Sequence, residues 1–324
     1  MDSLRSLGPD QQVGLLFVVL FGLLALASVG ALLASLRDRG ADQTERQQRL
    51  ARDLRALWIG ASVFWLAWIS GAPGATTLFG IVSFLSLREY LTLLKTRRGD
   101  HRSLVLAFFF VLPMQYLLLD WRQFDLASVF IPVYVFLAIP VLAALAGDPQ
   151  RFLERNAEIQ WGIMVCVYGL SQAPALLLLD WPGRPGRGAF LLLFLVVVTA
   201  VAQIAQEAAS RRLRRRPLAR HIDRSFSLRA LGVGVAASAL AGVALFWITP
   251  FAPVQALLMA ALAGAAGNLG EFVMRALKKD AGIRAWGNTA SVTGAVGLLD
   301  RVAPLCFAAP VFIHAVRWLF GTMR

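Results

Sequence analysis

Apolar runs long enough to cross a membrane recur along almost the whole chain. Its 324 residues are 58% hydrophobic and only 16% charged, which is more apolar surface than a water-soluble core can bury. A hydrocarbon layer of roughly 30 Å needs about 20 apolar residues per helix. The runs are continuous and not alternating, which favours helices over the strands of a barrel. The sequence therefore predicts an all-α, polytopic membrane protein.

Charged residues, or Pro and Gly, divide the chain into about ten expected transmembrane helices. The weakest boundary is the one between the second and third helices, where Pro73 and Gly74 separate a short run from the next. The expected spans are residues 13–36, 56–71, 74–93, 103–120, 125–146, 159–180, 188–208, 230–249, 252–277 and 302–320. We expect them to form a single integral membrane domain over residues 1–324.

The distribution of basic residues predicts the orientation in the membrane. Every second connector is basic, and these connectors hold 25 of the 32 Lys and Arg. Because Lys and Arg collect on the cytoplasmic side, we expect basic cytoplasmic loops and both termini outside, in the cell inner (plasma) membrane. The first run is too long for the core of a signal peptide, so we expect it to be retained.

Composition also excludes some classes of function. The net charge of +13 follows from topology and from contact with anionic lipid, so we expect no nucleic acid as a partner. Cys166 and Cys306 lie in apolar runs, and the three His are scattered over separate segments. That spacing does not suit zinc.

The connector SRRLRRRPLARHIDRSFSLR, from Ser210 to Arg229, is the most basic one and holds eight Arg. Such a segment can simply lie against anionic headgroups. Alternatively, it can bind a phosphate-rich ligand, because the guanidinium group pairs with phosphate through two hydrogen bonds. The candidates for phosphate or lipid headgroup binding are Arg215, Arg216, Arg220 and Arg224, together with Lys279 of the connector described next.

A second polar connector, Lys278 to Arg301, reads KKDAGIRAWGNTASVTGAVGLLDR. It places two carboxylates, Asp280 and Asp300, near membrane level beside cations. Hard oxygen ligands next to Lys and Arg suit the magnesium complex of a nucleoside triphosphate. Ordinary ion pairing at helix ends is the alternative interpretation.

These segments resemble the C-terminal signature of the phosphatidate cytidylyltransferase (CDP-diacylglycerol synthase) family. That signature has a Gly-Asp pair in an apolar span ending in Lys-Arg-Asp, and later Leu-Asp-Arg-x-Asp. This chain has Gly270-Glu271, then ALKKDAGIRAWG, then LLDRVAPLCFAAPVF. Upstream, SFLSLREYLTLLKTRRGDHR and RFLERNAEIQWGIMVCVYGLSQAPALLLLD also resemble the bacterial branch. The resemblance makes residues 13–100 the N-terminal helices and 188–320 the part similar to the family's catalytic region.

The resemblance implies a set of site residues. Lys278, Asp280, Asp300 and Arg301 correspond to catalytic positions, and Asp300 with Glu271 to metal ligands, with Mg²⁺ as the cofactor if the protein is active. An alternative register aligns GNLGEF, Gly267 to Phe272, with the family pattern and requires a three-residue insertion before Lys278.

The departures from the family pattern fall at functional positions. The family carries charged or hydroxyl side chains at six places where this chain differs, namely Gln203 (aspartate), Phe226 (lysine), Arg229 (glutamate), Glu271 (aspartate), Arg275 (serine) and Ala303 (aspartate). One lost transition-state contact commonly costs about 3 to 4 kcal/mol. The replacements therefore predict that the ordinary rate is lost.

Three functions follow as alternatives. The first is transfer of a cytidylyl group from CTP to phosphatidate, giving CDP-diacylglycerol and diphosphate, in a rearranged site. The second is a catalytically lapsed relative that binds an anionic lipid, phosphatidate, or a partner membrane protein. The third is a lipid transporter. A transport path would need charged residues lining several spans, and the spans hold few of them. A homodimer or a heteromeric membrane partner is a further expectation.

Overall fold

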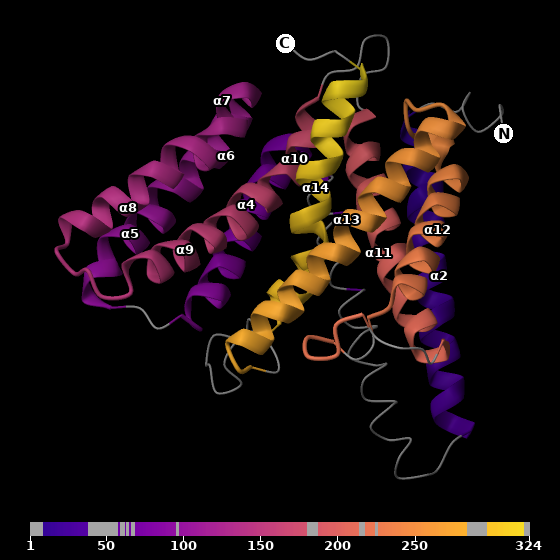
Figure 1. Ribbon diagram of the computed structural model, residues 1–324. Helices are drawn as coiled ribbons and strands as arrows, with labels where there is room; N and C mark the ends of the chain where they lie inside the picture. The colour runs from indigo at the N-terminus through magenta and orange to yellow at the C-terminus, as the bar shows by residue number, and fades with distance from the viewer. Residues whose placement is uncertain are drawn as a thin grey trace. The chain divides into compact units, whose positions relative to one another are not determined.

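The protein is an all-α structure, as the sequence predicts. The computed structural model describes residues 9–37, 58, 62, 65, 69–94, 97–179, 187–213, 218–223, 226–283 and 297–320, and over these ranges it contains helices and no β-strand. The chain forms two compact units, Met1–Ala75 and Thr76–Arg324. Figure 1 shows the described helices.

The first unit contains the helix α2, Pro9–Arg37. The ring centroid of Phe17 in α2 lies 4.9 Å from that of Trp65, and the two rings meet edge to face. The Nε1 of Trp58 donates a hydrogen bond of 3.0 Å to Oγ of Ser28. Most of the expected span 56–71 lies outside the described residues. The helix α4, Gly71–Leu91, begins at Gly71 with a φ of 70°. It therefore starts three residues before the expected span 74–93, and Pro73 and Gly74 lie in its first turn.

The second unit continues with long helices, several of which include short π-helical or 3₁₀ turns. The first runs through α5, His101–Leu106, and α6, Leu112–Asp120. The next runs through α7, Phe124–Val129, and α8, Phe136–Leu145. A third runs through α9, Phe152–Ile163, and α10, Leu170–Ala175. The remaining helices are α11, Arg187–Arg212, α12, Leu228–Ala244, α13, Pro253–Asp280, and α14, Leu298–Phe320.

Six of the described helices are long and apolar enough to cross a membrane, which confirms the polytopic class. They are Arg98–Asp120, Phe124–Leu145, Phe152–Leu178, Gly188–Arg212, Pro253–Asp280 and Leu298–Phe320. They correspond to six of the expected spans. The helix α12 and the stretch Phe17–Leu33 of α2 are apolar but shorter. A total of about ten spans stays a prediction.

The helices α11, α12, α13 and α14 pack as neighbours (Figure 1). Small residues allow this close approach. A Cβ placed on Gly270 of α13 would lie 2.2 Å from Cγ of Phe307 in α14, and one on Gly264 would lie 2.5 Å from Oγ of Ser238 in α12. Helices in lipid associate through such close contacts between small residues. The face of α13 next to Glu271 is thereby held against α14.

A buried ion pair joins the connectors at the ends of the neighbouring helices. The Nε of Arg155 lies 3.1 Å from Oδ1 of Asp100, and both side chains are 2% exposed. The Nη1 of Arg155 also donates to Oδ2 of Asp148 at 2.7 Å. This hydrogen bond from Arg155, with another from the backbone of Gln150, lowers the pKa of Asp148. Breaking a buried pair of this kind leaves an uncompensated charge, so the network fixes both connectors.

Candidate functional site

The last turns of α13 carry four of the predicted site residues, namely Glu271, Lys278, Lys279 and Asp280. Glu271, Arg275 and Lys278 follow one another at intervals of four and three residues, which places them on one face of the helix. All three are partly buried, whereas Lys279 and Asp280 at the end of the helix are exposed. The face toward the protein therefore holds three charged groups, and their partners come from other segments.

The first group of partners surrounds Arg275. Its Nη1 donates to Asp223, in the segment between α11 and α12, and its Nη2 donates to Glu271. Gln203 of α11 donates from Nε2 to Oε2 of Glu271 at 3.1 Å. We call Gln203, Asp223, Glu271 and Arg275 the closed cluster, because both carboxylates are paired with the same guanidinium group.

Phe272, which follows Glu271 in the sequence, forms an aromatic pair with Phe226. Phe226, which is 3% exposed, stacks on Phe272 with ring centroids 4.1 Å apart and planes 22° from parallel. The next residue, Ser227, begins α12 and accepts a hydrogen bond of 3.2 Å from the backbone N–H of Ala230. This N-cap fixes the start of α12, and with it the inward direction of Phe226.

The second charged pair joins α13 to α14. The Nζ of Lys278 donates to Oδ1 of Asp300 at 2.5 Å, and the two side chains are 18% and 36% exposed. We call Lys278 and Asp300 the open pair, because it is more exposed than the carboxylates of the closed cluster. The sequence predicted both residues as site residues, and the structure brings them together.

Glu89 of α4 holds the beginning of α14. Its Oε1 accepts from the backbone N–H of Gly297 at 2.6 Å, and its Oε2 accepts from that of Leu299 at 2.7 Å. The first N–H groups of a helix have no partner within the helix, and a carboxylate there also interacts favourably with the helix dipole. Glu89 is only 4% exposed. It therefore fixes the backbone that carries Asp300.

The other predicted residues do not join these groups. Asp280, Lys279, Arg301 and Arg220 are exposed, and no hydrogen bond or ion pair links them to another described side chain. Ala303, the position of a family aspartate, is 1% exposed and packs in the core. Arg215, Arg216 and Arg224 lie outside the described residues. The roles of all these residues stay predictions.

The described carboxylates do not fit a magnesium site. Mg²⁺ demands near-octahedral oxygen ligands, with carboxylates among them. Both oxygens of Glu271 already accept hydrogen bonds, and Asp300 is paired with Lys278. In the described part of the chain no three His, Cys, Asp or Glu residues come together as metal ligands. The expected pair of metal ligands, Glu271 and Asp300, is thus committed to two different cations.

Sequence reasoning missed Glu89 as a site residue. The backbone donors that Glu89 binds at the start of α14 lie more than 200 residues away in the chain. An acidic residue inside an apolar run is itself a signal, because burial of a charge requires a partner. The sequence gives no sign of which partner it has.

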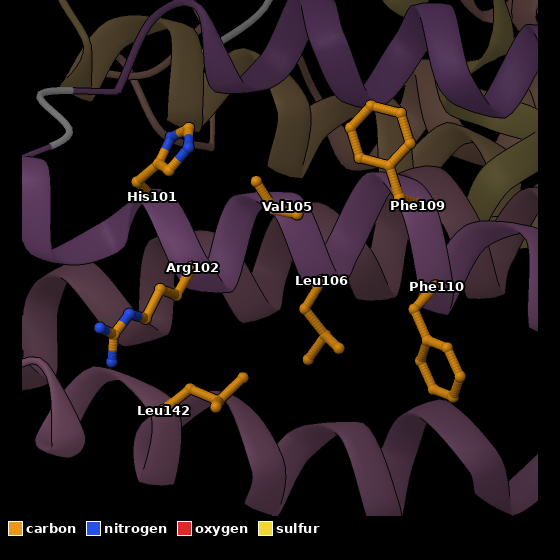
Figure 2. Close-up of a pocket in the computed structure, with 7 residues that line it drawn as sticks. All are labelled: His101, Arg102, Val105, Leu106, Phe109, Phe110 and Leu142. Atoms are coloured by element: carbon orange, nitrogen blue, oxygen red, sulfur yellow. The ribbon is translucent and has the colours of Figure 1, made fainter.

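A groove of about 550 Å³ lies between the segments that carry Arg102 and Leu142, and none of its lining residues belongs to the closed cluster or the open pair. Figure 2 shows Arg102 and His101 at one end and Phe109 and Phe110 at the other, with Leu142 across the gap on α8. The walls are mostly apolar, and Arg102 is exposed. A cation beside an apolar wall is a general lipid contact.

The apolar helices define a polytopic membrane protein. Its candidate site is the set of charged side chains where α11, α13 and α14 meet. The family model described as "Cytidylyltransferase family" matches residues 50–319. The chain belongs to this family, which confirms the resemblance noted in the sequence. It is also 35% identical over 263 residues to "Uncharacterized protein YnbB" of Escherichia coli (strain K12), a match covering 81% of this chain and 85% of that protein.

Proposed function

We propose that this chain binds the phosphate headgroup of an anionic membrane lipid, with phosphatidate as the expected ligand, and has lost the ordinary cytidylyl transfer of its family. The observation that carries this proposal is the stack of Phe226 on Phe272. The resemblance puts a lysine at position 226, and a buried phenyl ring supplies neither charge nor hydrogen bond.

Cytidylyl transfer depends on positioned cations. The phosphatidate oxygen attacks the α-phosphorus of CTP and diphosphate leaves, so negative charge must be neutralised as it develops. The guanidinium group of Arg275 is already paired with Asp223 and Glu271, and Phe226 cannot replace a lysine. These contacts support loss of rate.

Binding of a phosphate headgroup has simpler requirements. Lys279 and Arg301 are exposed at the facing ends of α13 and α14, and no described carboxylate pairs with either. Exposed cations at the expected membrane surface attract anionic lipids by about 1 kcal/mol each. A lipid held there would have its acyl chains along the apolar helices.

The open pair favours a second candidate, an active cytidylyltransferase with a rearranged site. Lys278 and Asp300 are two of the expected catalytic residues, and they are in contact. A lysine beside a carboxylate can bind a phosphate and release the carboxylate for another role. Mg²⁺, the cofactor that the resemblance implies, would belong to this candidate.

One experiment separates the two candidates. The purified full-length protein in detergent receives radiolabelled CTP, phosphatidate and Mg²⁺, beside an Asp300→Asn variant. We expect no CDP-diacylglycerol from either, and phosphatidate enriched among the co-purified lipids measured by mass spectrometry. Turnover that Asp300→Asn abolishes would establish the enzyme instead.

Charge variants locate the lipid. Lys279→Gln combined with Arg301→Gln should lower the co-purified phosphatidate several-fold, since two headgroup contacts are lost. Arg102→Gln is the matched control, because it removes an exposed Arg at the separate groove of Figure 2. Loss of phosphatidate in Arg102→Gln alone would contradict the proposed place and assign the lipid to the groove.

A further inference from the structure

The closed cluster gathers two carboxylates around one cation. Asp223 and Glu271 have side chains that are 12% and 16% exposed, and that of Arg275 is 32% exposed. Two carboxylates brought this close repel each other strongly where water is mostly excluded. A positive charge between them is therefore a condition for this arrangement.

A guanidinium group meets that condition without an external ion. Its planar shape offers several N–H donors in fixed directions, and here Nη1 serves Asp223 while Nη2 serves Glu271. The remaining oxygen of Glu271 accepts from Gln203. Asp223 lies between α11 and α12 and Glu271 lies on α13, so Arg275 connects these two segments. Gln203 of α11 joins the cluster through Glu271.

We propose that Arg275 is a built-in cation that occupies the place where Asp223 and Glu271 would otherwise hold a divalent metal ion. This part of the site is consequently formed without metal. The inference concerns the same site as the proposed function. It rests on that proposal in one respect, which is that no metal-dependent cytidylyl transfer is expected. Its experiment measures metal binding and not turnover or lipid, so the two proposals can fail separately.

Removing the guanidinium group should turn the cluster into a metal site. The variant Arg275→Ser leaves the carboxylates of Asp223 and Glu271 facing the vacated space, and carboxylate oxygens are ligands of the type that Mg²⁺ and Mn²⁺ prefer. Arg275→Lys keeps a positive charge and should not bind metal. Arg275→Ser combined with Glu271→Gln removes one carboxylate and should lose most of the binding.

The test is Mn²⁺ binding to purified full-length protein in detergent, followed by the electron paramagnetic resonance signal of free Mn²⁺. We expect no binding to the unchanged protein below about 1 mM, and binding at least about tenfold tighter in Arg275→Ser. Mn²⁺ should raise the melting temperature of Arg275→Ser above its value in EDTA. The melting temperature of the unchanged protein should be the same in Mn²⁺ and in EDTA, because a ligand stabilises only a protein that binds it.

Two results would overturn the inference. One is tight Mn²⁺ binding to the unchanged protein that Glu271→Gln removes, since the metal would then share the site with Arg275. The other is a folded Arg275→Ser that binds no more Mn²⁺ than the unchanged protein. If Arg275→Ser folds only when Mn²⁺ is present during purification, the inference is supported. If Arg275→Ser does not fold at all, Mn²⁺ binding to the unchanged protein decides.

Discussion

The closed cluster and the open pair lie within two turns of each other on α13, yet they differ in how their charges are satisfied. In the closed cluster one guanidinium group is shared by two largely buried carboxylates from different segments. In the open pair one lysine meets one carboxylate, and Asp300 remains 36% exposed. The first is arranged as a structural connection, and the second keeps groups that a ligand can reach.

In the closed cluster, the residues that replace family residues compensate one another. The resemblance gives the family an aspartate at 271 and a serine at 275, and here Glu271 and Arg275 pair at the favourable spacing of four residues. Gln203, at another family aspartate, then donates to Glu271. Three departures that look independent in the sequence form one hydrogen-bonded unit in the structure.

The largest effect should come from Arg275→Ala, which breaks the closed cluster. It leaves Asp223 and Glu271 without their shared cation, and removing one partner of a mostly buried pair costs about 3 kcal/mol. Thermal unfolding in detergent measures the loss. The matched control is Arg211→Ala, because Arg211 pairs with Glu207 at the same spacing of four residues but is exposed.

The control should lose no more than about 0.5 kcal/mol. Similar small losses in both variants would mean that the closed cluster adds no stability, and the contrast drawn with the open pair would be wrong. Recovery in a variant that also carries Asp223→Asn and Glu271→Gln would assign the loss to the stranded carboxylates.

The fold could be predicted from the sequence further than the site. Continuous apolar runs predicted α13 and α14 closely, since residues 252–277 and 302–320 became Pro253–Asp280 and Leu298–Phe320. The shorter α12, which ends at Ala244, shows a limit. Its expected span 230–249 continued through Phe246–Ile248, which forms a 3₁₀ turn. Hydropathy alone does not distinguish an α-helical end from a tighter turn.

At the site, residue types were predictable and partners were not. The resemblance marked Lys278 and Asp300 because both match the family motif, but it also paired Glu271 with Asp300 as metal ligands. The structure instead gives Glu271 to Arg275 and Asp300 to Lys278. Pairing depends on helix rotation and on segments such as 218–223, and neither is readable from one sequence without the packing.

A second prediction concerns the support of the open pair. Glu89→Gln keeps the size of the side chain but leaves one amide group facing a backbone N–H of α14, so one of the two hydrogen bonds of Glu89 is lost and its charge disappears. Losing a charged acceptor from buried donors costs about 2 kcal/mol. Thermal unfolding in detergent measures it, and Glu207→Gln, an exposed glutamate on α11, is the control.

The outcome also tests whether α14 is held separately from the closed cluster. If Glu89→Gln and Arg275→Ala act on separate features, the loss in the double variant equals the sum of the single losses to within about 0.5 kcal/mol. A clearly smaller combined loss would show that the two regions form one cooperative unit, and the comparison above would have to be abandoned.

The smallest effect on stability should come from the open pair itself. Lys278→Ala removes an ion pair whose carboxylate is partly exposed, and such pairs contribute about 1 kcal/mol or less. The same variant should reduce co-purified phosphatidate if Lys278 turns from Asp300 to a lipid phosphate on binding. Lys279→Ala, one residue along and exposed, is the matched control for stability and should leave the melting temperature unchanged.

A loss of stability in Lys278→Ala as large as that in Arg275→Ala would show that the open pair is a second structural connection. The ligand contacts would then be limited to Lys279 and Arg301, where the proposed function already places the lipid.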